Sequence, residues 1–213
     1  MKYAEMHYAI SLDNRPGYPY ALAGLARIAA NKKDYKKAIE LYERADSASN
    51  DYSFREALIE MYRLNGNSKQ SLLIANSIVV EMEKAASAMA KGDSSGHYAD
   101  KEMAYAYLSI NNFDKAIRHA LLEYNRRPNN IDANETVAWV YYKMNDYPKA
   151  ESYIKAALKT SCQNPTLLLH AASIYSKAGN KPMALDCFRQ ALKNNPNISP
   201  LLQDEAKQAI SSL

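Results

Sequence analysis

The sequence predicts an all-α fold, an α-α superhelix in which antiparallel helix pairs stack into a right-handed solenoid. Three observations support this prediction. A short segment recurs at intervals of 33 or 34 residues, helix-ending prolines fall at fixed places between the copies, and glycine is scarce, with 6 among 213 residues. A fixed period of about 20–50 residues is typical of repeat arrays. We therefore expect residues 1–213 to form one solenoid.

The recurring segment ends in a small residue, which we call the anchor. Its clearest copies cover residues 33–38, 111–116, 145–150 and 179–184, so that the anchors are Ala38, Ala116, Ala150 and Ala184. The same spacing extends upstream to Ser71 and Ala4. Nine residues before the anchors stand mostly tyrosines: Tyr62, Tyr107, Tyr141 and Tyr175. Each copy therefore predicts a hairpin of two helices that meet at its anchor.

Polar caps and prolines mark the expected ends of these helices. Four N-caps precede the second helices, Asp34, Asn112, Asp146 and Asn180. Their side-chain oxygens suit the unpaired N–H groups of a first turn. Pro148 and Pro182 fit that first turn. Because proline cannot continue a helix, second helices are expected to end at Pro16, Pro128 and Pro196.

This pattern resembles the tetratricopeptide repeat, a helix–turn–helix unit of about 34 residues. The shared elements are a small residue early in the first helix (helix A), a tyrosine later in it, the anchor early in the second helix (helix B), and a closing proline. The resemblance covers nearly the whole chain. The chain departs from it at the fourth position of helix A, where the family often has a large residue and this sequence has Leu22, Arg55, Asp100, Asn134 and Leu168.

On this pattern the array has a half-repeat, five hairpins and a cap. The half-repeat is a lone helix B at 1–16, the hairpins occupy 18–50, 51–96, 97–130, 131–164 and 165–198, and the capping helix occupies 199–213. A lone helix B predicts further repeats upstream in the same chain. Ser71 and Ala116 are one period plus 11 residues apart. We therefore expect the second helix B to run about three turns too long and to project from the stack.

Composition and charge argue against several classes of function. The 27 basic and 23 acidic residues are mixed along the chain, without the basic stripe of a nucleic-acid binder. No stretch of 18 apolar residues exists, so no membrane span is expected. Cys162 and Cys187 belong to no C-x-x-C pair. We expect two free thiols, which favours a cytoplasmic over a periplasmic location.

Motifs for catalysis, metal binding or cofactor binding are not found. The histidines His7, His97, His119 and His170 lack metal-binding spacing and are interpreted as surface or packing residues. No nucleophile elbow or phosphate-binding glycine loop occurs. The sequence therefore predicts a protein without catalytic residues, metal or cofactor.

The resemblance implies a binding groove. In tetratricopeptide proteins helix A lines the concave side, and its second, fifth, ninth and twelfth positions face the ligand. The candidate groove residues on this basis are Tyr20, Arg27, Arg63, Tyr98, Lys101, Tyr105, Trp139 and Tyr142. Aromatic residues and arginine are frequent in interface hot spots. We expect the aromatic residues to hold apolar side chains of a peptide and the cations to hold an acidic group, unless Trp139 packs against a neighbouring repeat instead.

The leading functional hypothesis is a non-catalytic scaffold for a protein or an extended peptide. One alternative is a glycan-binding helical-repeat platform, which would need a coplanar arc of aromatic rings. Another is a regulatory repeat segment of a larger multidomain protein. Repeat physics does not identify the partner, because fold does not imply function.

Overall fold

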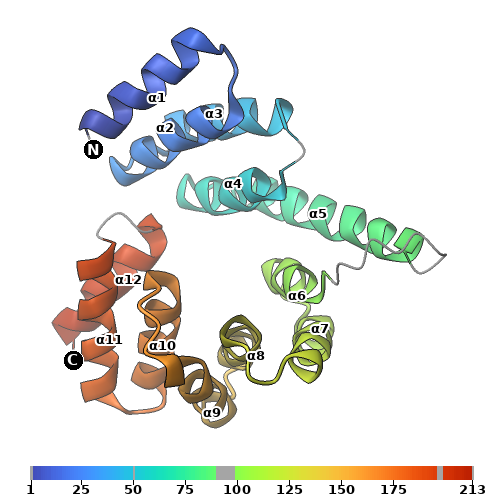
Figure 1. The fold of residues 1–213 in the computed structure, drawn as a ribbon, viewed down its shortest axis with the longest axis vertical. Coiled ribbons are helices and arrows are strands. Elements are labelled where there is room, and N and C mark those ends of the chain that lie inside the picture. The colour runs from blue at the N-terminus through green and yellow to red at the C-terminus, as the bar shows by residue number, and fades with distance from the viewer. Residues whose placement is uncertain (1, 50, 90–98, 196–198, 213) are drawn as a thin grey trace. The chain divides into compact units, whose positions relative to one another are not determined.

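A computed structural model describes residues 2–49, 51–89, 99–195 and 199–212. Those residues form α-helices joined by short turns, with one 3-10 turn and no strand among them (Figure 1). The all-α fold of stacked helix pairs is therefore confirmed. Contacts divide the chain into a first unit, Met1–Val80 with Ser199–Leu201, and a second unit, Glu81–Ile198 with Leu202–Leu213.

The first unit contains α1 to α4 and the start of α5. The bounds are α1 Lys2–Asn14, α2 Pro19–Asn31, α3 Tyr35–Ser47, α4 Tyr52–Leu64 and α5 Ser68–Met89. Consecutive helices from α1 to α4 pack on one another, and Leu22, Tyr42 and Phe54 lie in their common core. Gly24 sets the approach of α1 to α2, because a Cβ there would lie 2.4 Å from the Tyr8 ring. The lone helix expected at the start of the chain thus corresponds to α1.

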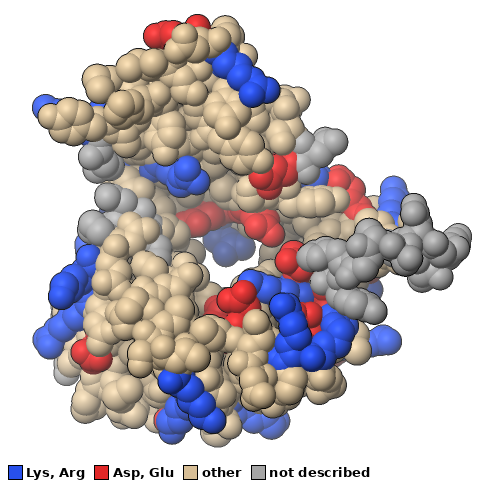
Figure 2. Space-filling view, in the orientation of Figure 1, with Lys and Arg blue, Asp and Glu red and all other residues tan. Residues whose placement is uncertain are grey.

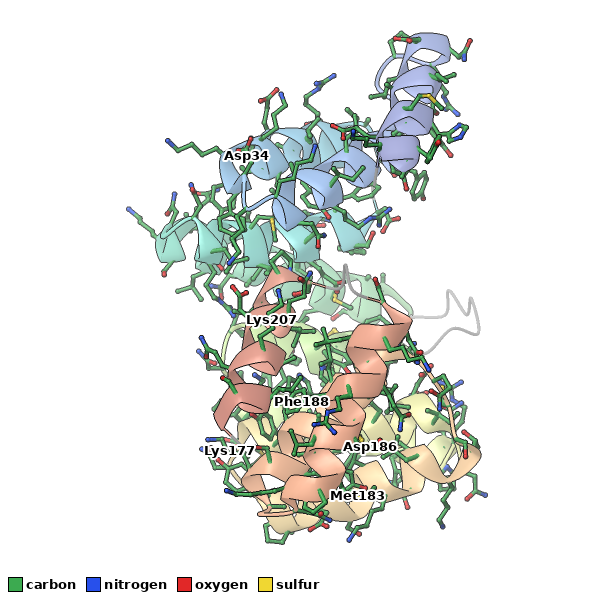
Figure 3. The ribbon with its side chains drawn as sticks, turned by 90° about the vertical axis from the view of Figure 1, so that its left-hand side faces the viewer. Asp34, Lys177, Met183, Asp186, Phe188 and Lys207 are labelled. Atoms are coloured by element: carbon green, nitrogen blue, oxygen red, sulfur yellow. The ribbon has the colours of Figure 1, made fainter. Side chains whose placement is uncertain are left out.

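The second unit contains α6 to α11 and most of α12. The bounds are α6 Asp100–Ser109, α7 Phe113–Arg126, α8 Ile131–Lys143, α9 Tyr147–Ala157 with a 3-10 turn at Leu158–Thr160, α10 Pro165–Lys177, α11 Lys181–Asn194 and α12 Pro200–Ser212. Its core includes Ile174 and Phe188, which is labelled in Figure 3. The capping helix expected at 199–213 corresponds to α12, whose Leu202, Ala206 and Ile210 pack into this core.

The turn between helix A and helix B is the same in five copies. Three residues separate the two helices, and the middle one has a positive φ in each copy: Lys33 (61°), Gly66 (79°), Asn111 (58°), Asn145 (62°) and Gly179 (85°). The N–H of the next residue donates to the carbonyl five residues back, for example Asp34 to Ala29 at 3.0 Å. This is the bond pattern with which a left-handed residue ends a helix.

The predicted N-caps are confirmed. The side chains of Asp34, Asn112, Asp146 and Asn180 each accept a hydrogen bond from the N–H three residues ahead, and Figure 3 shows Asp34 at the start of α3. Asn67 does the same for α5 through the N–H of Gln70. Local chemistry therefore fixes where each helix B begins.

The prediction of an over-long second helix B is confirmed. Helix α5 has 22 residues, whereas α3 has 13 and α7 has 14. The extra turns, from Glu81 to Met89, belong to the second unit. Residues 90–98, which include His97 and Tyr98, lie outside the described residues. That the helix projects from the stack stays a prediction.

Candidate functional site

Helix A of each hairpin carries the candidate binding positions. These helices are α2 and α4 in the first unit and α6, α8 and α10 in the second. Within the second unit α6 contacts α8 and α8 contacts α10, so these three A helices lie side by side. The B helices α7, α9 and α11 pack along the outside of this row (Figure 1). The groove positions of each unit can therefore be compared residue by residue.

The helix A face of the first unit exposes an aromatic ring. Tyr20 is 51% exposed, and its edge meets the Phe54 ring at a centroid distance of 5.5 Å. Its hydroxyl donates to Asp51 Oδ2 at 3.2 Å, which raises the pKa of Tyr20. Because Asp51 also caps α4 through the N–H of Ser53, it holds the ring at the edge of the face.

Two exposed cations complete this face. Arg27 on α2 and Arg63 on α4 have no carboxylate partner within the part of the chain that the structure describes. Between Tyr20 and Arg27 on the same helix, Ala23 is buried in the core of the unit, so it presents no side chain to a ligand. Glu56 and Glu60 lie on α4 as well, and Glu60 accepts hydrogen bonds from Ser199 and from the N–H of Leu201 in the same unit. Figure 2 shows both basic and acidic side chains on the surface of the first unit, at the top of the view. The face therefore carries both signs of charge, with Arg27 and Arg63 as its cationic positions.

The corresponding face of the second unit is filled by its own side chains. Glu135 on α8 accepts a hydrogen bond from the Tyr105 hydroxyl at 2.9 Å and pairs with Nδ1 of His170 on α10. Glu135 is 8% exposed and His170 is 6% exposed. Burial first, and then the neighbouring Glu135, raises the pKa of Tyr105 well above its ordinary value. This Tyr105–Glu135–His170 group joins three consecutive A helices.

Trp139 belongs to the same packed group and is 8% exposed. The His170 ring stacks on it at 3.6 Å and the Tyr142 ring at 4.8 Å. Lys143 Nζ lies 4.5 Å from its centroid. Trp139 therefore packs against a neighbouring repeat, which is the alternative to ligand contact considered from the sequence. Little of its ring surface is left for a ligand. Ligand contact by Tyr105, Trp139 and Tyr142 stays a prediction.

Lys101 differs from the two arginines of the first unit. Its Nζ lies 3.3 Å from Asp132 Oδ2, so an acidic neighbour on α8 offsets its charge. The repeat pattern predicts Lys101 as a groove residue, but it predicts neither the pairing with Asp132 nor the buried contacts of Glu135 and His170. Glu135 occupies a fifth, ligand-facing position and could have been found there, whereas His170 occupies a sixth position that the groove pattern does not include.

The extension of α5 is tied to the second unit by a polar cluster. Glu83 accepts hydrogen bonds from the Tyr107 hydroxyl at 2.5 Å and from Lys115 Nζ at 2.9 Å. The Tyr107 bond and then the Lys115 bond lower the pKa of Glu83. The Tyr107 ring also stacks on His119, whose Nδ1 is 2.6 Å from Asp100. His119 thus has a packing role, as predicted from its spacing.

The described residues contain no group of three or more side chains able to hold a metal ion. Across the same residues, no helix has the length and apolar character needed to cross a membrane. Cys162 and Cys187 are both free thiols, as expected.

Comparison with known proteins agrees with the repeat analysis. The tetratricopeptide repeat family matches residues 4–68 and 136–197, which together exceed half of the chain. No curated protein matches. A thermophilic repeat protein of Thermus thermophilus, TTC0263, is 17% identical over 91% of this chain and 99% of its own, with a TM-score of 0.54. Human IFIT1, solved as a dimer with m7Gppp-AAAA, is 16% identical over 98% of this chain and 49% of its own, with a TM-score of 0.57. Likeness at such identities shows the fold alone.

Proposed function

The chain belongs to the tetratricopeptide repeat family, and we propose that it is a non-catalytic scaffold that holds an extended peptide of another protein on the helix A face of its first unit. The carrying observation is that Tyr20, Arg27 and Arg63 are exposed there. The second unit has filled the equivalent face with its own side chains. An exposed aromatic ring next to exposed arginines is the residue combination that dominates peptide and protein interfaces.

The spacing of Tyr20 and Arg27 gives the ligand a pattern. Seven residues are about two helical turns and about 10 Å of rise, so both side chains lie on one side of α2. An extended peptide covers that length with about three residues, at about 3.4 Å each. The ligand we propose therefore carries an apolar side chain for Tyr20 and, three residues away, an acidic side chain for Arg27.

Arg63 adds a second cationic position on α4. A carboxylate that reaches either guanidinium forms a charge-assisted, bidentate bond. Since both arginines are solvent-exposed, the attraction is screened by salt. The affinity for an acidic peptide is therefore expected to fall with ionic strength, and a peptide with lysines in place of the acidic residues is expected not to bind.

The test is a fluorescence-anisotropy screen of labelled eight-residue peptides with an apolar residue and an aspartate at varied spacing. We expect binding to peak at a spacing of three and to weaken at least tenfold in the Arg27→Ala/Arg63→Ala variant. Arg44→Ala is the matched control, because Arg44 is exposed on helix B of the same unit. Its affinity should stay within twofold of that of the unaltered chain.

Two outcomes would refute the proposal. One is that no peptide binds below about 1 mM, a weak limit for a specific contact. The other is that the arginine double variant and Arg44→Ala bind equally. A glycan array run in parallel distinguishes the glycan-binding alternative from the peptide-binding proposal. If the alternative is right, the chain binds sugars on the array and does not bind the peptides.

A further inference from the structure

The outer side of α1 is an uncovered apolar stripe. Tyr3 is 80% exposed, Met6 is 48% exposed and Ile10 is 47% exposed. Their spacing of three and four residues places them on one side of the helix. Contiguous exposed apolar side chains of this kind on a folded protein usually mark an interaction surface.

This stripe is not the side that holds α1 to its own unit. Tyr8 and Leu12 face α2, where Tyr8 fits over Gly24 and Leu12 joins the core. Glu5 pairs with Lys32 of α2 at 2.9 Å. The stripe lies about half a turn away from these contacts. Removing its apolar side chains would therefore leave the packing of α1 on α2 intact.

The other B helices carry at most one large apolar side chain at the equivalent positions, namely Leu73 on α5, Leu122 on α7 and Met183 on α11. Counted from the anchor, Tyr3, Met6 and Ile10 of α1 correspond to Lys37, Glu40 and Arg44 of α3, all exposed. On α11 they correspond to Met183, Asp186 and Gln190, of which Met183 and Asp186 lie on its outer surface in Figure 3. The outer side of a helix B is thus mostly polar elsewhere in the chain, and α1 departs from that pattern because all three positions are large and apolar.

Opposite charges flank the two ends of the stripe. Lys2 and Asp13 are both exposed, and neither has an ion-pair partner among the described residues. They are 11 residues apart, about three turns, so they lie along the same edge of the helix. Lys2 neighbours Met6 at four residues, and Asp13 neighbours Ile10 at three. The stripe therefore has a cation at one end and an anion at the other.

We propose that this stripe is a homodimer interface, on which α1 of a second copy lies antiparallel about a two-fold axis near Met6. Antiparallel pairing brings Lys2 of each copy beside Asp13 of the other, because the axis exchanges the two ends of the helix. A patch of this kind is self-complementary, as a two-fold interface must be. This surface is separate from the peptide-binding face, so either proposal can fail without the other.

The contact is small, which sets the expected affinity. Three apolar side chains and two ion pairs fall well short of the about 800 Å² that each partner buries in a stable complex. A dissociation constant of about 10–100 µM corresponds to a small interface of this type. The two ion pairs lie at the rim and give the pair its antiparallel direction more than its strength.

The test is sedimentation velocity of the full chain between 5 and 500 µM. We expect the mass to rise from 23.9 kDa toward twice that value. The variant Tyr3→Lys/Met6→Glu/Ile10→Arg gives α1 the residues that α3 carries at these positions. It should weaken the dimer at least tenfold and keep the helical circular dichroism signal. A chain that stays monomeric at 500 µM, or a variant that still dimerises, would overturn the proposal.

A charge exchange tests the direction of pairing. Lys2→Asp alone should weaken the dimer about fivefold, because it sets two like charges against each other at both ends. Lys2→Asp/Asp13→Lys should restore the affinity to within twofold of the original. If the double variant is as weak as the single variant, Lys2 and Asp13 do not meet and the antiparallel arrangement is wrong.

Discussion

The two helix A faces of this chain use the same repeat positions in opposite ways. In the first unit the ninth position of α2 holds the exposed Arg27, whereas in the second unit the ninth position of α8 holds the buried Trp139. The fifth position of α8 holds Glu135, which bonds to Tyr105 and His170 on neighbouring helices. The repeat framework thus specifies where a side chain lies, and the residue type decides whether it is available to a ligand or joins the fold.

This difference has a physical cause. Large side chains at the groove positions of consecutive A helices can reach one another. A buried carboxylate placed between two hydrogen-bond donors satisfies the hydrogen-bonding capacity of both donors. Alanine at the same positions, such as Ala23, cannot bridge helices and leaves the flanking side chains in water. Stability and binding are therefore expected to depend on different units of the molecule.

The largest effect is expected for Trp139→Ala. Removing a buried aromatic side chain of this size costs about 3–5 kcal/mol, because the rings of His170 and Tyr142 lose their stacking partner. Tyr20→Ala, at a half-exposed ring on the other face, should cost less than about 1 kcal/mol. Urea unfolding followed by circular dichroism measures both. Equal losses for the two variants would contradict the comparison.

The unaltered chain offers a check, since Trp139 is its only tryptophan. We expect blue-shifted emission that acrylamide quenches poorly, because the ring is 8% exposed. Red-shifted and readily quenched emission would place the ring on an open groove and return it to the candidate ligand-binding residues.

A smaller loss is expected for Glu135→Ala. It leaves the Tyr105 hydroxyl and the His170 ring without their acceptor, and an unsatisfied buried polar group costs about 1–3 kcal/mol. Glu135→Gln is the matched control, because its amide oxygen can still accept one hydrogen bond, and it should lose less than the alanine variant. If both variants unfold at the urea concentration of the unaltered chain, the buried group does not stabilise the second unit.

Alkaline pH should weaken the second unit before the first. Burial raises the pKa of the Cys187 thiol to about 11, whereas an unfolded cysteine ionises near pH 8.5, so between about pH 8.5 and 11 the unfolded state alone has lost the proton. The free energy of unfolding should therefore fall by about 2 kcal/mol between pH 8 and 10. Burial raises the pKa of Tyr42 in the first unit to about 12, so its effect begins only above about pH 10.

Urea midpoints at pH 8 and 10 measure this effect. Cys187→Ala should remove the loss, and Cys162→Ala, at the half-buried thiol, is the control that should keep it. A midpoint that is unchanged at pH 10 in the unaltered chain would show that the Cys187 thiol ionises alike in the folded and unfolded states.

The parts of this structure that follow from local chemistry could be predicted from the sequence. A capping side chain such as Asp34 acts on an N–H three residues away, so the sequence contains both partners at a fixed spacing. The same holds for the 11 additional residues between Ser71 and Ala116, from which the lengthening of α5 could be predicted. These features need no knowledge of how one hairpin packs on the next.

The packed face of the second unit could not be predicted in this way. Glu135 and His170 are 35 residues apart and meet only because α8 packs on α10. Lys101 on α6 and Asp132 on α8 likewise meet only because these two helices pack on each other. A ligand-facing position can be assigned by counting, but its exposure depends on the size and polarity of side chains one repeat away.

The smallest effect we predict concerns the repeated turn. Lys33 holds the left-handed conformation that glycine occupies at Gly66 and Gly179. That conformation costs a residue with a Cβ about 1 kcal/mol relative to glycine. Lys33→Gly should therefore stabilise the first unit, by about 0.5 kcal/mol once the greater flexibility of unfolded glycine is included. Asn145→Gly is the matched change in the second unit and should gain less, because asparagine tolerates this conformation. A gain from Asn145→Gly as large as that from Lys33→Gly would show that strain at the turn does not distinguish the two units.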